Sequence, residues 1–596
     1  MTFRGSLARL FADYRWYILG AGGILAFALG CIGFMQSPAK PDTTYVIYQC
    51  LRLFLMEGEP EPHAPVALNI ARFLAPIVAG WAGITALGSV FRDRVQQMWI
   101  PWMRDYVVIC GLGQYVGLVF VRHLREKRIR TIVIEVDPAN PNIELCRGLG
   151  VPVIVGDAQR LATLRAAGAH RARRVLAVTD DDAVNTQIVA TWRELPTRRS
   201  RQPICLARIA DPDFCSLLRI QEVQRGDELS VDFFNIDEIG ARLLLKQFPI
   251  ETDCAQPHIL VAHLDPLGAW LIYHAARAWH EQRGDATAPL MVTVLDHAPE
   301  ESIQALRSRH PELKNVCDFK PFRATAEDMG ERLPGHYLDP ATPRISHAYV
   351  TAYHDHQAFQ TALKLRHELH KVDPNVPVVV ALSRPHGVAS LLADAKKAGS
   401  LAYVDVFPTM ERACTVELVQ GGSFEPLAEE IHETWRAEEL EDGKPAPLWT
   451  DLDDSRKESS RAQARHIAVK LRTIGCAVAP LRDWDAKDFK FTDEEVEKLA
   501  VDEHLRWWQE RLADGWKLIG MPKTDDEDEA ERILEQAKRR KESPYLIPWP
   551  DLLELYPKIA EYDRLMVREI PNRLASVGLQ AIRTDTTATP AAQGAA

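Results

Sequence analysis

Two long apolar runs dominate the first hundred residues. Positions 16–35 carry no charged side chain, and a helix of about 20 apolar residues is long enough to cross a bilayer. A second run covers 66–91 and is most apolar from residue 73 onwards. A helix that begins at 66 must turn Arg72 towards the interface or towards protein. We therefore predict two transmembrane helices, at 16–35 and 66–91.

Basic residues flank both runs, whereas the segment between them is acidic near its end. Because positively charged flanks remain on the cytoplasmic side, we predict a cytoplasmic N-terminus (1–15), an extracytoplasmic loop (36–65) and a cytoplasmic body, in the cell membrane. The flanking residues are Arg4, Arg9, Arg15, Arg92, Arg94 and Arg104, and the loop carries Glu57, Glu59 and Glu61.

The loop contains a mostly apolar stretch, 45–56, which could form a short re-entrant or interfacial helix. Two helices around a re-entrant helix would suit a potassium-channel pore, whose filter is a T-V-G-Y-G-type loop of stacked carbonyls. The stretch is instead followed by Glu-Gly-Glu-Pro-Glu-Pro, residues 57–62. We therefore favour an anchor or assembly element, and whether the chain itself conducts ions stays open.

Beyond residue 104 the apolar runs become short and alternate with helical stretches. Residues 107–110 predict a buried strand, 115–126 a helix, and 131–136 and 151–155 two further strands. This order is typical of a dinucleotide-binding Rossmann unit, which binds its ligand at the glycine-rich turn after the first strand.

Each glycine of this turn has a distinct predicted role. Gly111 permits the tight turn, and Gly113 lets the backbone approach a pyrophosphate at the helix N-terminus. The third glycine, Gly117, comes one residue later than in G-x-G-x-x-G, so the helix could start shifted or kinked. Glu135 lies where a ribose-binding acid belongs. The sequence favours a bound nucleotide, and the alternative is a Rossmann fold that has lost its ligand.

The same order of strands continues and then recurs. Strands are expected at 174–179 and 203–208, and after an offset of about 150–175 residues at 258–262, 290–296, 348–353 and 377–382. The pattern predicts an α/β protein with two tandem doubly wound domains, 105–250 and 257–440. In the second copy Asp265 stands where Gly113 would meet a phosphate, so we interpret this copy as a structural partner.

Composition excludes some classes of protein. A net charge of −11 gives no support for nucleic-acid binding. The 10 cysteines show no C-x-x-C pair or zinc spacing, so we expect reduced thiols and no metal site. Residues 584–596 are rich in Thr, Ala and Pro and are predicted to be a disordered tail.

Four short motifs after the membrane helices resemble the RCK family, the regulators of potassium conductance. They are Cys-Gly-Leu-Gly from Cys110, Ile-Glu-Val-Asp-Pro from Ile134, Val-Gly-Asp-Ala from Val155, and Val-Thr-Asp-Asp-Asp from Val178. The resemblance implies that NAD(H) or another adenine nucleotide contacts Gly111, Gly113, Gly117, Glu135, Asp157 and Thr179. It also implies coupling to a membrane pore, and we expect a homo-oligomer with a possible ion-channel partner.

A charged, proline-containing linker, 443–458, precedes a third module at 459–583 that is predicted to be mainly α-helical. A helix begins after Thr492, which forms a capping box with Glu495, and Gly515 is its predicted C-cap. The acidic stretch 525–541 is predicted to be a mobile loop.

This module resembles the ryanodine-receptor (RyR) repeat. The shared marks are a helix ending in Glu-x-x-x-x-Gly-Trp, a Pro-Tyr-Leu-x-Pro-Trp loop and a Tyr-Asp-Arg triplet. The resemblance implies a sensor of a small or nucleotide ligand, with His504, Trp508, Arg511, Trp516, Asp563 and Arg564 as candidate contacts. The alternative is a core in which Trp507, Trp516 and Trp549 pack and Glu503 or Asp563 pairs with Arg511.

The hypothesis that we favour is a membrane-anchored, nucleotide-sensing regulator linked to potassium or other ion transport. No separate substrate domain and no His/Lys/Tyr constellation accompanies the glycine turn, so we predict no catalytic residues and no enzyme activity. An NAD-dependent oxidoreductase and a non-binding membrane scaffold remain as alternatives.

Overall fold

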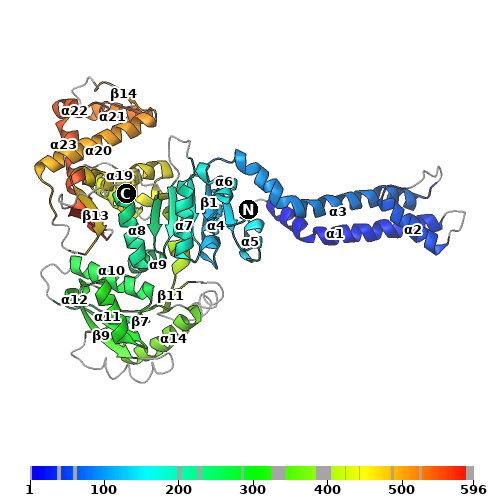
Figure 1. Cartoon of the computed structure of the whole chain (residues 1–596), viewed down its shortest axis with the longest axis horizontal. Helices are drawn as coiled ribbons and strands as arrows, with labels where there is room; N and C mark the ends of the chain where they lie inside the picture. The colour runs from blue at the N-terminus through cyan, green and yellow to red at the C-terminus, as the bar shows by residue number, and fades with distance from the viewer. Residues whose placement is uncertain are drawn as a thin grey trace, which may run out of the picture. The chain divides into compact units, whose positions relative to one another are not determined.

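The computed structural model consists of two compact units, residues 1–103 and 104–596 (Figure 1). It describes residues 3–36, 42–57, 64–196, 204–225, 231–251, 253–282, 288–323, 343–352, 354–383, 404–422, 425–441, 443, 445–482, 484, 489–522, 527–576 and 578–584. The predicted tail lies almost entirely outside these residues.

The first unit contains three helices: α1 (Phe3–Met35), α2 (Thr43–Phe54) and α3 (Val66–Trp99). Two stretches are long and apolar enough to cross a membrane, Tyr17–Met35 and Val66–Ile84. The second apolar stretch therefore includes Arg72 and is shorter than predicted. The Arg72 guanidinium donates a hydrogen bond to Asn69 Oδ1 of the same helix at 3.5 Å. The predicted short helix of the loop is present as α2.

Close packing inside this unit depends on small residues. A Cβ atom on Gly33 of α1 would lie 2.6 Å from Leu68 Cβ of α3, so only glycine allows this approach. In the middle of α2, Cys50 is buried and its Sγ lies 3.6 Å from Cys31 Sγ of α1. Large apolar side chains such as Phe73, Ile77 and Ile84 point outwards from α3, as expected for helices that face lipid or protein.

The second unit begins with a six-stranded parallel sheet in the order β3-β2-β1-β4-β5-β6. Its strands are β1 (Tyr106–Cys110), β2 (Arg130–Glu135), β3 (Val153–Val155), β4 (Arg174–Ala177), β5 (Ile204–Arg208) and β6 (Val231–Phe234). Helices α4 (Val116–Glu126), α5 (Asn142–Gly148), α6 (Leu161–Ala166), α7 (Asp182–Arg193) and α8 (Pro212–Arg225) connect them. The doubly wound prediction is confirmed for this segment, and β6 adds a strand that the apolar pattern had not indicated.

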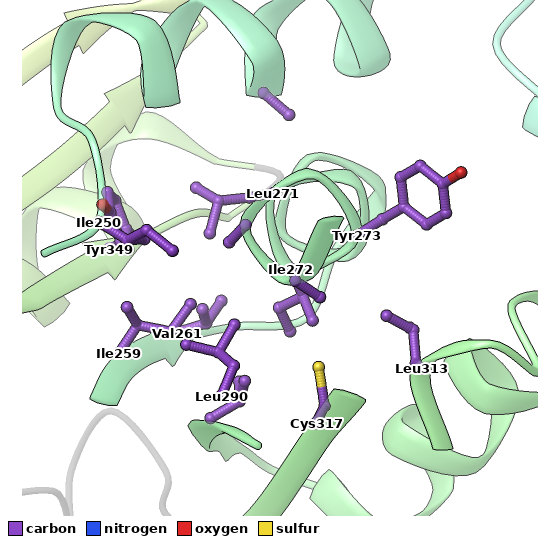
Figure 2. Packing of buried hydrophobic residues seen from close by; sticks show 14 of the residues in the cluster. Ile250, Ile259, Val261, Leu271, Ile272, Tyr273, Leu290, Leu313, Cys317 and Tyr349 are labelled. Carbon is purple, nitrogen blue, oxygen red and sulfur yellow. The ribbon is translucent and has the colours of Figure 1, made fainter. Parts of the chain in front are cut away.

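The second sheet repeats this topology, in the order β12-β11-β10-β7-β8-β9. Its strands are β7 (His258–Ala262), β8 (Leu290–Asp296), β9 (Cys317–Arg323), β10 (His347–Val350), β11 (Val378–Leu382) and β12 (Val404–Pro408). The helices described around it are α10 (Pro266–Gln282), α11 (Pro299–Arg309), α12 (Leu313–Val316) and α14 (Asp355–Val372). Figure 2 shows how α10 buries Leu271 and Ile272 against the strand residues Val261 and Leu290.

The two Rossmann-like domains exchange the helices that follow their last strands. After β6, α9 (Ile236–Gln247) buries Ala241 and Leu244 in the core of the second domain. After β12, α16 (Thr409–Ala413) and α17 (Val416–Gly421) return to bury Ala413 and Leu418 in the core of the first. This reciprocal packing fixes the two domains together with apolar contacts in both directions.

The C-terminal module is mainly helical, as the sequence predicts. It contains α18 (Glu425–Glu441), α19 (Asp454–Thr473), α20 (Asp493–Ala513), α21 (Glu527–Arg539), α22 (Trp549–Leu555), α23 (Pro557–Arg568) and α24 (Ile570–Ser576), with antiparallel strands β13 (Cys476–Pro480) and β16 (Leu579–Arg583). A second pair, β14 (Lys517–Leu518) and β15 (Glu542–Ser543), follows α20.

The predicted ends of α20 are confirmed in this module, whereas a predicted loop is not. The capping box of Thr492 and Glu495 is present, and Gly515 follows α20 with a φ of +81°. The predicted mobile loop at 525–541 is wrong, because most of it forms α21. Ala530, Leu534 and Ala537 recur at helical spacing and turn inwards, so one apolar face stabilises a helix despite the high charge of the segment.

Candidate functional site

The glycine turn after β1 has the geometry that a nucleotide-binding turn requires. Gly111 has a φ of +89°, and a Cβ there would lie 2.5 Å from Thr179 Cγ2. Gly113 has a φ of +55°. Positive φ values favour glycine. The turn lies between β1 and β4, where the strand order reverses. Open parallel sheets bind ligands at this position, outside the carboxyl ends of the strands.

Gly117 occupies the packing position of the third glycine, although it is one residue late. Helix α4 starts at Val116, after Tyr115. A Cβ on Gly117 would lie 2.3 Å from Gly111 O and 2.7 Å from Leu112 Cα. The extra residue is therefore absorbed before the helix begins, and Gly117 still allows the helix to pack directly on the turn.

Glu135, at the end of β2, is buried and braces the turn. Its Oε2 accepts the backbone N–H of Leu112 at 2.8 Å, and its Oε1 accepts that of Asp137 at 3.0 Å. Asn140 Nδ2 donates to Oε2 at 3.3 Å. A carboxylate has about four lone-pair positions, so Oε1 can still accept one ribose hydroxyl. The structure adds a role that sequence reasoning missed, since Glu135 also fixes the turn.

Two asparagines on the segment after β2 also reach the turn. Asn140 Nδ2 and Asn142 Nδ2 each lie 3.4 Å from Gly113 O, and Asn142 Nδ2 donates to Gln114 O at 3.2 Å. Sequence reasoning missed both. The signal was the run Asp-Pro-Ala-Asn-Pro-Asn that follows the predicted ribose-binding strand, since short polar side chains there can bond nearby backbone.

On the β4 side, Thr179 is held by a buried asparagine. Asn185 Oδ1 accepts both the backbone N–H and the hydroxyl of Thr179, at 2.9 and 2.8 Å. Asn185 Nδ2 donates to Thr179 O and to Arg208 O. Asn185 is fully buried, and a buried amide with all of its bonds made fixes the backbone around it. Sequence reasoning missed this residue.

Asp180 places a carboxylate against the turn itself. Its Oδ2 accepts the backbone N–H of Gln114 at 3.0 Å, and a Cβ on Gly113 would lie 3.1 Å from both carboxylate oxygens. Arg208 lies 3.4 Å from Oδ1. The backbone donor that would face a phosphate is therefore bonded to a protein carboxylate. Because the Asp180 side chain is about half exposed (51%), it can move aside at modest cost.

Asp157, after β3, lies beside the end of β2. Gly156 N donates to Glu135 O at 2.8 Å, and Asp157 Oδ1 accepts the backbone N–H of Gln159 at 2.9 Å. The structure therefore brings five of the six predicted residues to the carboxyl edge of one sheet, with Gly117 directly behind the turn. Burial raises the pKa of the Cys110 thiol to about 12, so this neighbour is a poor nucleophile.

The second domain retains the brace but not the glycine turn. Leu264 N donates to Asp296 Oδ2 at 3.1 Å, as Leu112 N does to Glu135. His263 has a φ of +64°, the counterpart of Gly111. Asp265, in contrast, accepts the backbone N–H of Gly268 at 2.8 Å, in the first turn of α10. Asp265 therefore matches Gly113 in sequence order but not in backbone conformation, because it does not share the positive φ of that glycine.

The candidate residues of the C-terminal module form two groups rather than one. Arg564 bonds Glu497 near the start of α20 at 2.7 Å, whereas Arg511 lies 14 positions further along the same helix. A rise of 1.5 Å per residue separates these points by about 21 Å. The candidate contacts Arg511 and Arg564 therefore cannot meet on one small anion, because α20 holds the two arginines apart.

In the first group His504 is buried, Asp563 and Arg564 are partly buried, and each of these side chains is bonded. His504 Nε2 lies 2.8 Å from Ile547 O, and Nδ1 lies 3.5 Å from Asp563 Oδ2. Burial opposes the charged imidazole, yet Asp563 and Ile547 O together raise the pKa of His504. The Arg564 guanidinium lies 5.8 Å from the Trp549 ring. This group is a core cluster, and Trp549 packs as the structural alternative predicts.

The second group is half-exposed. The Arg511 guanidinium lies 4.5 Å from the Trp516 ring centre and 5.8 Å from that of Trp507. Neither Glu503 nor Asp563 pairs with it, because Glu503 bonds Lys470 and Arg506. Trp508 lies on the same helix, with its ring 6.4 Å from that of His504. Trp507 and Trp516 are partly buried and both contact Arg511, so the packing alternative stays open for them.

No metal centre accompanies these sites in the part of the chain that the structure describes. No group of three or more His, Cys, Asp or Glu side chains there is arranged to hold an ion.

A doubly wound parallel sheet defines the class: a Rossmann-like α/β domain, which occurs twice in tandem and carries a glycine turn at the switch point of its first copy. Residues 107–225 match the family model described as the TrkA-N domain.

Curated relatives match a short part of the chain. A "Glutathione-regulated potassium-efflux system protein KefC" from Escherichia fergusonii is 34% identical over 88 residues, which cover 15% of this chain and 14% of the relative. A KefC from Escherichia coli O139:H28 is 33% identical over 88 residues with the same coverage. The chain thus spans 14% of the length of these relatives.

Solved structures show a weaker likeness over more of the chain. A structure described as GsuK bound to ADP is 17% identical, with a TM-score of 0.36, and covers 69% of this chain and 98% of that chain. A GsuK channel bound to NAD is 14% identical, with a TM-score of 0.36, and covers 71% and 85%. Both TM-scores are below 0.5, so they do not establish that the whole chains share one fold.

Proposed function

We propose that this chain is a membrane-anchored regulator whose first Rossmann-like domain senses NAD(H) or another adenine nucleotide. The observation that carries the proposal is the turn from Gly111 to Gly113 at the switch point of the sheet, braced by Glu135. It presents backbone to a pyrophosphate and one free carboxylate position to a ribose.

Asp180 gives this site a means of reporting occupancy. A nucleotide phosphate that binds the turn displaces the carboxylate from Gln114 N, and Asp180 then turns towards Arg208, which already lies 3.4 Å away. Arg208 also donates to Thr179 O at 3.2 Å. Nucleotide binding therefore changes the interactions of both β1 and β4, which is what a sensor needs.

The regulated process that we propose is ion transport. The TrkA-N match and the similarity to potassium-efflux proteins support this choice. The two apolar helices would anchor the chain as part of a homo-oligomer or beside a channel partner. The segment after α2 reads Glu-Gly-Glu, so we expect the chain to regulate a separate pore rather than to form a potassium filter.

An oxidoreductase would need a proton donor or acceptor beside the nicotinamide. Tyr115, just before α4, and His123 of α4 are instead both bonded to the segment of α16. Tyr115 OH donates to Glu411 Oε1 at 2.8 Å, and His123 Nδ1 lies 2.8 Å from Cys414 O. Burial, followed by Glu411, raises the pKa of Tyr115 to about 12. We therefore propose that the chain is not an enzyme, and sustained NADH oxidation by the purified protein would refute this.

The RyR-like module would provide a second input. Arg511 between Trp507 and Trp516 offers a guanidinium and aromatic faces on an accessible surface. Such an arrangement can hold an anionic ligand that carries a planar ring.

The decisive experiment measures nucleotide binding to the full chain in detergent. Gly113→Asn accepts the positive φ but adds a side chain 3.1 Å from Asp180, so we expect NADH and ADP affinity to fall by at least about tenfold. Gly150→Asn is the matched control, because Gly150 has a φ of +72° and its Cβ would meet only Arg125 at 3.8 Å. Equal affinity in the two variants would reject the site, and no binding by the wild type would favour the scaffold.

A further inference from the structure

A cavity of about 1080 Å³ lies inside the second unit, where its three modules meet. Helices α8 and α9 of the first domain, α10 of the second domain and β13 of the C-terminal module all contribute to its lining. None of the six predicted nucleotide contacts is among the lining residues. The cavity is therefore separate from the glycine turn, and its size would admit a small organic molecule.

One wall of the cavity is aromatic. The Trp270 ring stacks on His274 at 5.7 Å, and His310 lies 5.5 Å from Trp270 and 4.6 Å from Tyr273. Figure 2 shows Tyr273 projecting from α10 on the side opposite Leu271. The Tyr273 hydroxyl donates to Leu481 O at 3.2 Å, so this wall is tied to the C-terminal module.

Arg242 of α9 lines the cavity without a partner. Its neighbour one turn earlier, Glu238, bonds Arg219 at 2.9 Å, and its neighbour one turn later, Lys246, bonds Glu429 at 3.2 Å. Within the described parts of the chain the Arg242 guanidinium makes no hydrogen bond and no ion pair. Burial is the main factor that lowers the pKa of Arg242, and an enclosed cation without an anion is costly.

His274, which also lines the cavity and feels the charge of Arg242, adds a second unused polar atom. Its Nε2 is buried and has no hydrogen-bond partner among the described residues. The pKa of His274 is held well below its ordinary value by burial first and then by Arg242, Arg277 and His310. The imidazole is therefore neutral, and the positive charges of Arg242 and Arg277 act on it.

We propose that this cavity binds a small organic anion, with its phosphate or carboxylate group against Arg242 and His274 and its apolar part against Trp270 and Tyr273. A guanidinium with free donors matches both kinds of anion. Glu238 and Glu429 act on Arg242 only at a distance, because each carboxylate is bonded to another cation. The anion supplies the charge that the fold leaves unmatched.

Position gives this site a regulatory consequence. The ligand would contact α9, α16 and α17, which the two Rossmann-like domains exchange. It would also contact β13 of the C-terminal module. Binding therefore stabilises the arrangement in which all three are packed together. This input is independent of the nucleotide at Gly113.

Thermal melting of the full chain tests the proposal, with inorganic phosphate and succinate as probes. We expect at least one probe to raise the melting temperature of the wild type. Arg242→Gln should weaken that binding by at least about tenfold. Without a probe, Arg242→Gln should melt at the same or a higher temperature, because it removes an unpaired enclosed charge.

Arg436→Gln is the matched control. Arg436 also lies on a helix and is half-buried, but it bonds Glu433 at 3.2 Å and lies outside the cavity lining. Arg436→Gln should leave probe binding unchanged.

The two probes distinguish the class of ligand. A response to phosphate alone identifies a phosphorylated ligand, and a response to succinate alone identifies a carboxylate. The proposal is overturned if neither probe shifts the wild type, if Arg242→Gln binds equally well, or if it melts lower without a probe. The shift must persist in Gly113→Asn, which separates this site from the nucleotide site.

Discussion

The carboxylate of Asp180 accepts a hydrogen bond from the backbone N–H of Gln114 at 3.0 Å, directly beside Gly113. A protein anion thus lies where the proposed nucleotide would place a phosphate. Asp180→Ala should therefore raise the affinity for NADH or ADP by about three- to tenfold, or ~0.7–1.4 kcal/mol. Titration calorimetry measures this directly.

The variant Asp181→Ala tests whether Asp180 acts through its direct bond to Gln114 or only through its negative charge. Asp181 carries the same charge but caps α7 by accepting from Ala183 N at 2.8 Å. That variant should lose about 1 kcal/mol of stability and gain little affinity. An equal gain in both variants would mean that Asp180 acts only through net charge.

Gly117→Ala should destabilise the protein by about 2–4 kcal/mol. The added Cβ would lie 2.3 Å from Gly111 O and 2.7 Å from Leu112 Cα, and backbone on both sides must shift to admit it. Denaturant unfolding of the full chain measures the loss. In the control, Gly148→Ala at the end of α5, the new Cβ meets nothing within 4 Å, so stability should be unchanged or slightly higher. A melting curve for Gly117→Ala that overlays the wild type would contradict the close packing.

Asp265→Asn should stabilise the protein at pH 8 and have little effect at pH 4. Burial raises the pKa of Asp265 to about 6 from an ordinary value of 3.8. Between these values the folded state binds more protons than the unfolded state, so its stability falls as pH rises. Above pH 6 the charged carboxylate costs about 1–3 kcal/mol, which asparagine avoids while still accepting from Gly268 N. Thermal melting across pH 4–8 should show a flatter profile for the variant, and parallel profiles would contradict the assignment.

Arg511→Ala should weaken a ligand of the RyR-like module without unfolding it. Its cation–π contacts with Trp516 and Trp507 are half-exposed and contribute about 0.5–1 kcal/mol each. We expect a small fall in melting temperature and a loss of any shift that adenine nucleotides produce in a Gly113→Asn background.

Arg564→Ala is the contrasting variant for this module. It breaks the 2.7 Å bond to Glu497 in the core cluster, so it should lower the melting temperature and leave the nucleotide shift in place. Identical nucleotide shifts in the Arg511→Ala and parent proteins would leave Arg511 with a purely structural role.

A reporter inserted after Glu57 should be accessible only from outside the cell. This follows from the basic flanks of the two apolar helices, because positively charged segments remain in the cytoplasm. Labelling of intact cells with an impermeant reagent tests it, and a reporter after Thr584 is the cytoplasmic control. Labelling of the Glu57 reporter only after permeabilisation would overturn the two-span topology.

Local sequence determined most of the architecture. Short apolar runs of β-branched residues, each followed by a helical period, predicted both Rossmann-like domains, because strand and helix patterns depend on near neighbours. Gly111 and Gly113 were recognisable for the same reason, since a turn and a helix start are local. The capping box at Thr492 and the C-cap at Gly515 also needed only a few adjacent residues.

Tertiary structure decided which polar groups meet. The bond from Asp180 to Gln114 and the brace of Asn185 join residues on different strands, and only the parallel order of the sheet brings them together. His504 and Arg511 are separated in role, although they are seven positions apart, because α23 covers one and leaves the other half-exposed. The lack of an ion pair at Arg242 is likewise invisible in the sequence, since Glu238 is spaced one helical turn away to pair with it. The folded chain instead pairs Glu238 with Arg219, and charge compensation depends on distances that only packing sets.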